Sequence, residues 1–179
     1  MTPMRISLQP VTVDDVAGLV SLRVAVSQHL AAQFPEILRP AGVTEKGIRF
    51  AMTRATLFVA RHRDQPIATL TLSTRKPWAI DTAYFSQSNA PLYLTDMAVS
   101  PRRQRKGVGR QCLEQAIKIA RQWSADAVRL DAYDAEYGAG DFYRKCGFRE
   151  VGRAVYRQTP LIYFEFLLPA DDKLKKASG

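Results

Sequence analysis

A run of basic residues and glycines at 102–110 is the part of the sequence best suited to bind an anion. It follows a β-prone segment, 92–99, and a helical pattern begins at its two glycines, Gly107 and Gly109. The first N–H groups of a helix lack intrahelical partners and carry the positive end of the helix dipole, and glycine lets a backbone approach an anion closely. Nearby Arg and Lys side chains would add charge-assisted hydrogen bonds. The order of strand, basic turn and helix start therefore predicts a diphosphate site.

Two motifs identify the kind of site more closely. The turn lacks Walker spacing, and Cys112 stands where the third glycine of Gly-x-Gly-x-x-Gly would be. Residues 104–109, Gln-Arg-Lys-Gly-Val-Gly, instead match the signature Gln/Arg-x-x-Gly-x-Gly/Ala, and residues 142–148, Phe-Tyr-Arg-Lys-Cys-Gly-Phe, match Phe-Tyr-x-x-x-Gly-Phe. On these two motifs, which cover its C-terminal half, the chain resembles the GCN5-related N-acetyltransferases (the GNAT family).

The resemblance implies an acetyl-coenzyme A site. The end of the central strand would pair with the pantetheine amides, and the basic turn would hold the diphosphate. The sequence departs from the family pattern at Glu136, where members often have Asn, so the pantetheine arm is expected to be held differently there. The expected coenzyme-binding residues are Met97, Ala98, Val99, Gln104, Arg105, Lys106, Gly107, Val108, Gly109, Arg110 and Ala139.

Acetyl transfer to an amine also needs a base for the amine and an acid for the leaving thiolate. The resemblance implies that Tyr143 of the second motif faces the coenzyme sulfur and is the general acid, since a phenol is protonated at neutral pH; a packing role is the alternative. Asp96, three residues before Val99, is the candidate base. It could equally be a carboxylate bonded to the backbone or to an Arg, with a water chain acting as the base.

The acceptor site is predicted near residues 75–90, which follow neither the helical nor the strand period. Loops of this length are often functional. The candidate acceptor-contacting residues are Trp78, Asp81, Tyr84 and Phe85, and Asp81 would meet a cationic amine. The alternative is a packed loop without a ligand. A small-molecule amine, a peptide N-terminus and a protein lysine all stay open as acceptors.

The remaining pattern predicts a mixed α/β fold. Strand, helix and strand over 92–132 form a parallel unit, and the earlier strands form an antiparallel meander. Together with the resemblance, this predicts a GNAT-like, mostly antiparallel central sheet with helices on both faces. Thr12 and Asp15 resemble a capping box at the first helix. Strands are expected at 5–9, 56–61, 67–73, 92–99, 127–132, 148–153 and 161–168, and helices at 13–32, 44–54, 108–124 and 136–145.

Length and composition suit one domain, expected at 1–169, with a polar tail at 170–179. The absence of a run of ~18 apolar residues and of a signal peptide predicts a cytoplasmic protein without a membrane partner. Two histidines and two cysteines without ligand spacing predict no metal. The net charge of +9 suggests nucleic acid, but five cations at 102–110 serve a coenzyme equally well. The alternatives to an enzyme are therefore a coenzyme A sensor without turnover and, third, a nucleic-acid-binding module; a homodimer is compatible with the resemblance.

Overall fold

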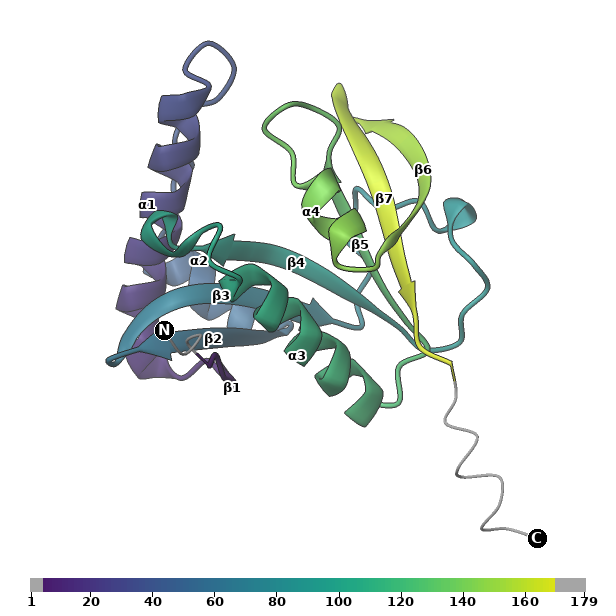
Figure 1. Ribbon diagram of the computed structural model, residues 1–179, viewed down its shortest axis with the longest axis horizontal. Coiled ribbons are helices and arrows are strands. Elements are labelled where there is room, and N and C mark those ends of the chain that lie inside the picture. Colours follow the sequence, from purple (N-terminus) through teal and green to yellow (C-terminus); the bar gives the residue numbers. More distant parts are fainter. Residues whose placement is uncertain (1–4, 170–179) are drawn as a thin grey trace, which may run out of the picture.

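The computed structural model describes residues 5–169, which form a seven-stranded sheet with helices on both faces (Figure 1). The predicted tail, 170–179, lies outside the described residues. No helix within 5–169 is long and apolar enough to cross a bilayer. In chain order the strands and α-helices are β1 (Leu8–Pro10), α1 (Val16–Gln33), α2 (Glu45–Met52), β2 (Thr56–His62), β3 (Gln65–Ser73), β4 (Pro91–Val99), α3 (Val108–Gln122), β5 (Ala127–Tyr133), α4 (Gly140–Lys145), β6 (Arg149–Tyr156) and β7 (Thr159–Leu167). Three short 3-10 turns are η1 (Val13–Asp15), η2 (Thr82–Tyr84) and η3 (Pro101–Arg103).

The sheet is mixed, as the sequence predicts. Its strand order is β1-β2-β3-β4-β5-β7-β6. Among the strand pairs of the described chain, β4 and β5 are parallel and the others are antiparallel. Helix α3 is the crossover between the two parallel strands, so the predicted strand–helix–strand unit is confirmed.

Strands β4 and β5 separate soon after they begin. Their pairing covers Pro91–Tyr93 against 127–129, although β4 continues to Val99 and β5 to Tyr133. Figure 1 shows the two strands starting together and then spreading apart. A register shift in the β3–β4 pair lies opposite Asp96, whose φ is 52°. This bulge helps to bend β4 away from β5, because an extra residue increases the local twist of a strand. The sheet is thus two halves joined at one end.

Each half of the sheet buries apolar residues against helices. Val16 and Leu19 of α1 pack with Ile48 of α2 and Val59 of β2 on one face. The opposite face holds the larger core, in which the apolar stripe of α3 packs on β2, β3 and β5. The buried residues of α3 include Val108, Cys112, Ala116 and Ala120, whereas Trp123 at its C-cap is exposed.

Several predicted boundaries differ from the structure by a few residues, and two of these differences have clear local causes. Helix α4 begins at Gly140 rather than at 136, because the Gly138 N–H donates to the Ala135 carbonyl at 2.8 Å and closes a turn. A Cβ on Gly138 would lie 1.9 Å from the Tyr133 carbonyl oxygen, so this turn requires glycine. The first strand is short because the N–H groups of Ile6 and Leu8 donate to glutamine side chains of α3, at 3.0 and 2.8 Å.

The segment 74–90 between β3 and β4 is folded against the sheet. Ile80 and Phe85 are buried with Tyr163 of β7. The buried Arg129 of β5 pairs with Glu165 at 3.3 Å and donates to the Ser86 carbonyl at 2.5 Å. These contacts hold the segment on the β5–β7–β6 half of the sheet.

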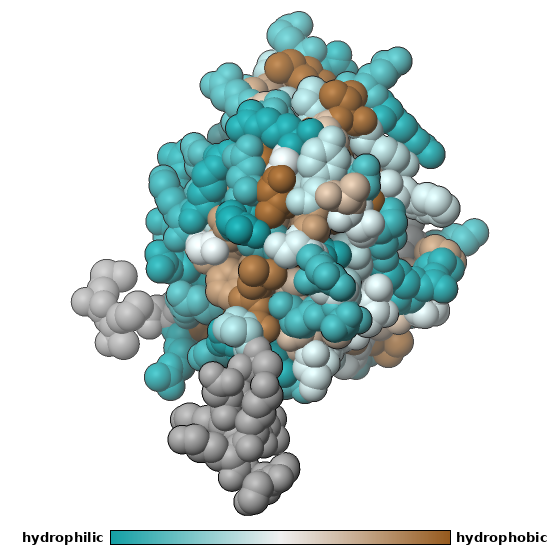
Figure 2. Space-filling model, turned by 90° about the vertical axis from the view of Figure 1, so that its right-hand side faces the viewer, coloured by the Kyte–Doolittle hydropathy of each residue, from teal (hydrophilic) through white to brown (hydrophobic). Residues whose placement is uncertain are grey.

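Strand β6 is an outer edge of the sheet. Its charged side chains Arg149 and Arg153 are exposed. Charges on an edge strand oppose pairing with another chain. Figure 2, which views this side of the molecule, shows apolar side chains as small areas separated by hydrophilic ones.

The capping box at Thr12 gives a stability prediction. Asp15 accepts from the Thr12 N–H at 2.8 Å and from two nitrogens of the Arg61 guanidinium, Nε at 2.9 Å and Nη2 at 2.5 Å. Burial alone would raise the pKa of the Asp15 carboxyl, but the hydrogen bonds from Arg61 and Thr12 outweigh burial and hold the pKa below 3.8. Asp15→Asn should lower the free energy of unfolding by about 1.5–3 kcal/mol at pH 7.

The pH dependence follows from the lowered pKa. A carboxyl with a depressed folded-state pKa stabilises the fold above its unfolded pKa and loses that contribution as the pH falls through the folded value. Urea unfolding of both proteins should therefore show a gap that is constant above about pH 5 and closes toward pH 3. A gap that widens in acid would contradict this role of Asp15.

Candidate active site

A cleft of about 570 Å³ opens where β4 and β5 diverge. Three parts of the fold bound the cleft. These are helix α1, the end of β4 with the start of α3, and helix α4 with the residue before it. The divergence therefore brings residues of both sequence motifs into one site. The lining residues are Val26, Met97, Ala98, Val99, Gln104, Arg105, Gly107, Gly109, Arg110, Ala139, Phe142, Tyr143, Lys145 and Cys146.

Nine of the eleven predicted coenzyme-binding residues line this cleft. Of the other two, Val108 is 1% exposed and packs in the core, so its backbone alone could face a ligand. Lys106 donates to the Arg102 carbonyl at 2.9 Å. Glu136, at the position where the family often has Asn, is exposed and lines a separate polar hollow.

The end of β4 presents backbone groups to the cleft. The Ser100 N–H donates to the Ile67 carbonyl of β3 at 2.8 Å. Because backbone groups alternate in direction along an antiparallel pair, Val99 points its N–H and C=O away from β3 and toward the opening. The Gln104 side chain donates to the Val99 carbonyl at 3.1 Å. Gln104 thus ties the turn to the strand, and the Val99 N–H is directed to the cleft.

The basic turn has the geometry of an anion cradle. Gly107 is the N-cap of α3 with φ of 78°, and Arg105 also has a positive φ of 57°. Successive N–H groups in such alternating conformations form an anion-binding concavity. The first N–H groups of α3 lack partners within the helix. Arg105 and Arg110 add positive charge at the lining of the cleft. This arrangement fits a diphosphate.

Tyr143 of α4 brings a phenol into the cleft. The residue is 7% exposed, and its Oη lies 4.0 Å from the Met97 sulfur of β4. Burial raises the pKa of the phenol, and the negative charge of Asp131 raises it further. The hydroxyl is therefore protonated at physiological pH and can donate a proton.

Asp131 is a candidate that the sequence analysis missed. It lies on β5 two residues beyond Arg129, the last residue paired with β4, and in the described chain it is not among the residues that line the cleft. Burial raises the pKa of its carboxyl, partly offset by its own backbone, and the charge of Asp96 raises it further. The available signal was a lone carboxylate inside the apolar segment 127–132.

Asp96, the predicted base, lies at the β4 bulge and is exposed. Within the described chain, the cleft lining does not include it. Its charge nevertheless acts on Asp131. Two interacting carboxylates, one from each diverging strand, thus lie beyond the point where β4 and β5 separate.

The four predicted acceptor residues lie on another part of the molecule. Trp78 is 88% exposed, and Asp81 accepts from the Ala83 N–H at 3.0 Å. The rings of Tyr84 and Phe85 pack on Tyr163, with centroids 5.3 and 5.4 Å apart. In residues 5–169 the cleft lining includes none of the four.

The surface that these four predicted acceptor residues occupy is close to Asp131, although it is separate from the cleft. Tyr163 is the cross-strand partner of Asp131, so the two side chains lie on the same face of the sheet. The next residue of β7, Phe164, packs on Tyr143. Neighbouring residues of a strand point to opposite faces, so the segment 74–90 and α4 cover opposite faces of this half-sheet.

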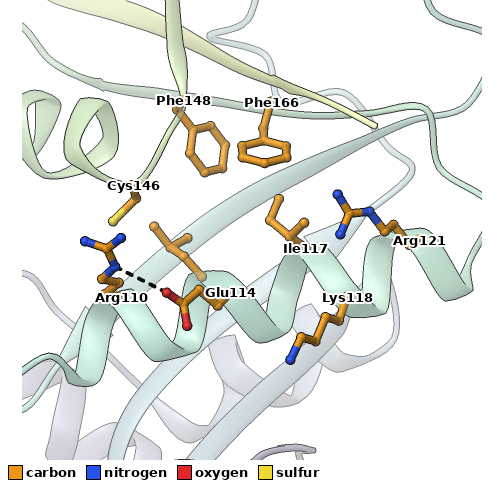
Figure 3. A pocket seen from close by; sticks show the side chains of 9 residues that line it. Arg110, Glu114, Ile117, Lys118, Arg121, Cys146, Phe148 and Phe166 are labelled. Carbon is orange, nitrogen blue, oxygen red and sulfur yellow. Dashed lines mark hydrogen bonds and ion pairs between the residues drawn. The ribbon is translucent and has the colours of Figure 1, made fainter. Parts of the chain in front are cut away.

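A second hollow of about 280 Å³ adjoins the cleft and shares Arg110 and Cys146 with it (Figure 3). Its rim carries further cations of α3, Lys118 and Arg121. Figure 3 shows the rings of Phe148 and Phe166 side by side above Ile117. The hollow thus has two aromatic rings along one wall and cationic side chains at its rim.

Gly107 gives a prediction for the turn. A Cβ at this position would meet nothing within 4 Å, so a substitution there costs backbone strain and no collision. An L-residue in the left-handed region costs about 1–2 kcal/mol, while Asn tolerates that region better than Ala. Gly107→Ala should therefore lose about 1–2 kcal/mol in unfolding free energy or coenzyme affinity, and Gly107→Asn less. Equal losses for the two variants would contradict the conformational explanation.

Comparison with known proteins supplies the family. A model described as "Acetyltransferase (GNAT) family" matches residues 23–148, more than half of the chain. A comparison with curated proteins finds no match.

Solved structures resemble the whole fold at low sequence identity. smu.2055 from Streptococcus mutans has a TM-score of 0.71 and 17% identity, covering 91% of this chain and 99% of that one. yncA from Salmonella typhimurium, solved with its cofactor acetyl-CoA, has a TM-score of 0.68 and 14% identity, covering 94% and 97%. The ribosomal-protein-S18-alanine N-acetyltransferase from Escherichia coli has a TM-score of 0.67 and 14% identity, covering 93% and 97%. At this identity the likeness establishes the fold.

Proposed function

The chain belongs to the acetyltransferase (GNAT) family, and we propose that it transfers the acetyl group of acetyl-CoA to a primary amine within a ternary complex. The observation that carries this proposal is the meeting of three groups in one cleft. These are the anion cradle at Gly107, the outward-facing backbone of Val99 and the buried phenol of Tyr143.

The cleft residues fit acetyl-CoA in order along its length. The diphosphate lies on the turn at Gly107, where α3 begins and Arg105 and Arg110 approach. The pantetheine arm follows the edge of β4, with the Val99 N–H as one donor. The acetyl group, which acetyl-CoA supplies, then lies near Met97 and Tyr143.

The side chains at the opening supply acid and base. A lysine-like amine has a pKa of about 10.4, so holding it neutral at pH 7 costs about 4.6 kcal/mol. Asp131, assisted by Asp96, accepts the amine proton, directly or through water. The neutral nitrogen attacks the thioester carbonyl, the C–S bond breaks, and Tyr143 donates its proton to the sulfur. The new amide nitrogen then releases its second proton, which returns through water to the Tyr143 oxygen.

Direct attack is favoured because neither cysteine suits an acyl carrier. Cys112 is 1% exposed, and burial raises the pKa of its thiol to about 11. Burial also raises the pKa of Cys146. A protonated thiol is a weak nucleophile, since the thiolate is the reactive form.

The second hollow is suited to the nucleotide end of the coenzyme. The rings of Phe148 and Phe166 offer a surface for the adenine, and Lys118 and Arg121 lie on the rim for the 3′-phosphate. Changing both cations to Ala should weaken coenzyme A binding about 5- to 10-fold. The same double change should alter binding of 3′-dephospho-coenzyme A by less than about 2-fold. Lys46→Ala, an exposed change on α2, is the control, and equal losses for both ligands would refute this placement.

Coenzyme thiol release with an amine panel tests the function. The panel includes alkylamines, lysine and peptides with N-terminal alanine, because one structural neighbour is a ribosomal-protein-alanine N-acetyltransferase. Acetylated product, identified by mass spectrometry, supports the proposal. Coenzyme binding without turnover of any amine would indicate a sensor. Salt-sensitive retention on a polyanion resin that coenzyme A does not compete would indicate nucleic-acid binding.

A further inference from the structure

Three aromatic rings link α1 to the second half of the sheet. Phe34, the C-cap of α1, contacts Tyr137 edge to face, with centroids 5.8 Å apart. Tyr137 in turn contacts Tyr133, at the end of β5, at 5.4 Å. In Figure 1, the end of α1 and the β5–α4 connection stand on opposite sides of the space between the two half-sheets. The rings therefore bridge a space that the ribbons leave open.

The bridge joins the two chain segments that supply opposite walls of the cleft, although in residues 5–169 the lining of the cleft includes none of its three rings. Val26 of α1 and Ala139 before α4 line the cleft from opposite sides. Phe34 follows Val26 by eight positions, which corresponds to about 12 Å of helix. Tyr137 precedes Ala139 by two positions. The ring pair thus connects the continuations of these two walls, a short distance along the chain from Val26 and Ala139.

The contact between the Phe34 and Tyr137 rings is weak enough to open and close while a substrate binds and leaves. An aromatic pair contributes about 0.5–1.5 kcal/mol beyond its buried area. Both rings are partly exposed, and Tyr133 is 50% exposed. The Tyr137 side is held more firmly, because Arg153 pairs with Asp134 at 3.0 Å. If the open state, with the rings apart, lies about 1 kcal/mol above the closed state in free energy, roughly 10–20% of the molecules are open.

We propose that the Phe34–Tyr137 pair roofs the acceptor entrance and restricts transfer to amines carried on slender, unbranched chains. This inference rests on the proposed function for the identity of the reacting group. With the roof closed, an acceptor must enter lengthwise between the diverging strands, past Asp131. An unbranched alkylamine or a flexible peptide N-terminus can do so. An amine attached directly to a ring cannot.

Transfer kinetics give the first test, with n-hexylamine as the slender probe and cyclohexylamine as the bulky one. Tyr137→Ala should raise the ratio of kcat/KM for cyclohexylamine to that for n-hexylamine at least 10-fold. Phe34→Ala should do the same. Tyr137→Phe keeps the ring and should preserve the wild-type ratio. An unchanged ratio in both alanine variants would overturn the proposal that the ring pair covers the acceptor entrance.

A thiol-labelling test does not depend on turnover. Met97→Cys in a Cys146→Ser background places one reactive thiol at the inner end of the cleft, and saturating desulfo-coenzyme A, which has no thiol to react with the reagents, fills the other side. Tyr137→Ala should raise the rate of labelling by a bulky biotin maleimide, relative to methyl methanethiosulfonate, at least 10-fold. Equal relative rates with and without the Tyr137 ring would overturn the proposal even if no acceptor is known. Failure of the proposed function has a different signature, because the wild-type protein would then acetylate no amine of the panel, whether or not it takes up coenzyme A in calorimetry.

Discussion

Tyr143→Phe is expected to lower kcat about 10²- to 10⁴-fold while leaving acetyl-CoA affinity within about 3-fold. In the proposed mechanism the phenol donates the proton, and its oxygen lies 4.0 Å from the Met97 sulfur. The phenyl ring of the variant keeps the contacts with Phe148 and Phe164, so the fold should not change. The measurement is steady-state thiol release combined with calorimetric titration of acetyl-CoA.

A matched control separates loss of the acid from loss of any tyrosine hydroxyl. Tyr156→Phe removes the same atom on β6, outside the residues that line the cleft. This control should retain wild-type kcat. If Tyr143→Phe also retained it, Tyr143 would be a packing residue and thiolate release would need no protein acid.

Asp131→Asn should lower kcat/KM at pH 7 by about 10²-fold or more. A base works in its ionised form, and burial together with Asp96 raises the pKa of Asp131. Wild-type activity should therefore fall as the pH drops through that raised pKa. This fall at low pH, the acid limb of the pH–rate profile, should be absent from the profile of the variant's residual activity.

The same substitution should not destabilise the protein at neutral pH. A carboxyl whose folded-state pKa is raised weakens the fold when it is ionised, above that pKa. Asn removes this unfavourable charge, so the Tm of Asp131→Asn should equal or exceed that of the wild type at pH 7. A catalytic role thus predicts less activity with undiminished stability, whereas a structural role predicts a loss of both.

Asp96→Asn tests which of the two carboxylates, Asp96 or Asp131, is the base. Asp96 is exposed at the bulge, and its charge raises the pKa of Asp131. Removing it should shift the acid limb to lower pH and change the plateau rate by less than about 10-fold. A loss as large as that of Asp131→Asn would instead make Asp96 the base, as the sequence analysis expected.

The turn that we propose binds the diphosphate could be predicted from sequence because its signals are local. Gly107 adopts a left-handed conformation that glycine tolerates, and the following residues begin a helix whose apolar stripe is buried. The family motifs likewise placed Tyr143 on a short helix. The parallel β4–β5 unit followed from the general rules for crossover connections.

The other end of the site depends on tertiary geometry that the local pattern does not record. Residues 127–132 read as an ordinary strand, and nothing in their sequence shows that β5 leaves β4 after Arg129. The importance of Asp131 follows only from that divergence. The contact between Phe34 and Tyr137 joins residues about a hundred positions apart, which composition and periodicity do not reveal. The segment 75–90 showed aromatic residues but not the face of the sheet on which they pack.

Calorimetric titration of the purified protein with coenzyme A tests the central claim most directly, because it measures binding without assuming an acceptor. We predict saturable binding at one site per chain, with an affinity that falls as salt is raised, since cations at the turn contact phosphates. Gly107→Ala should bind more weakly under the same conditions. Absence of any saturable uptake up to about 1 mM coenzyme A would contradict the assignment of this cleft.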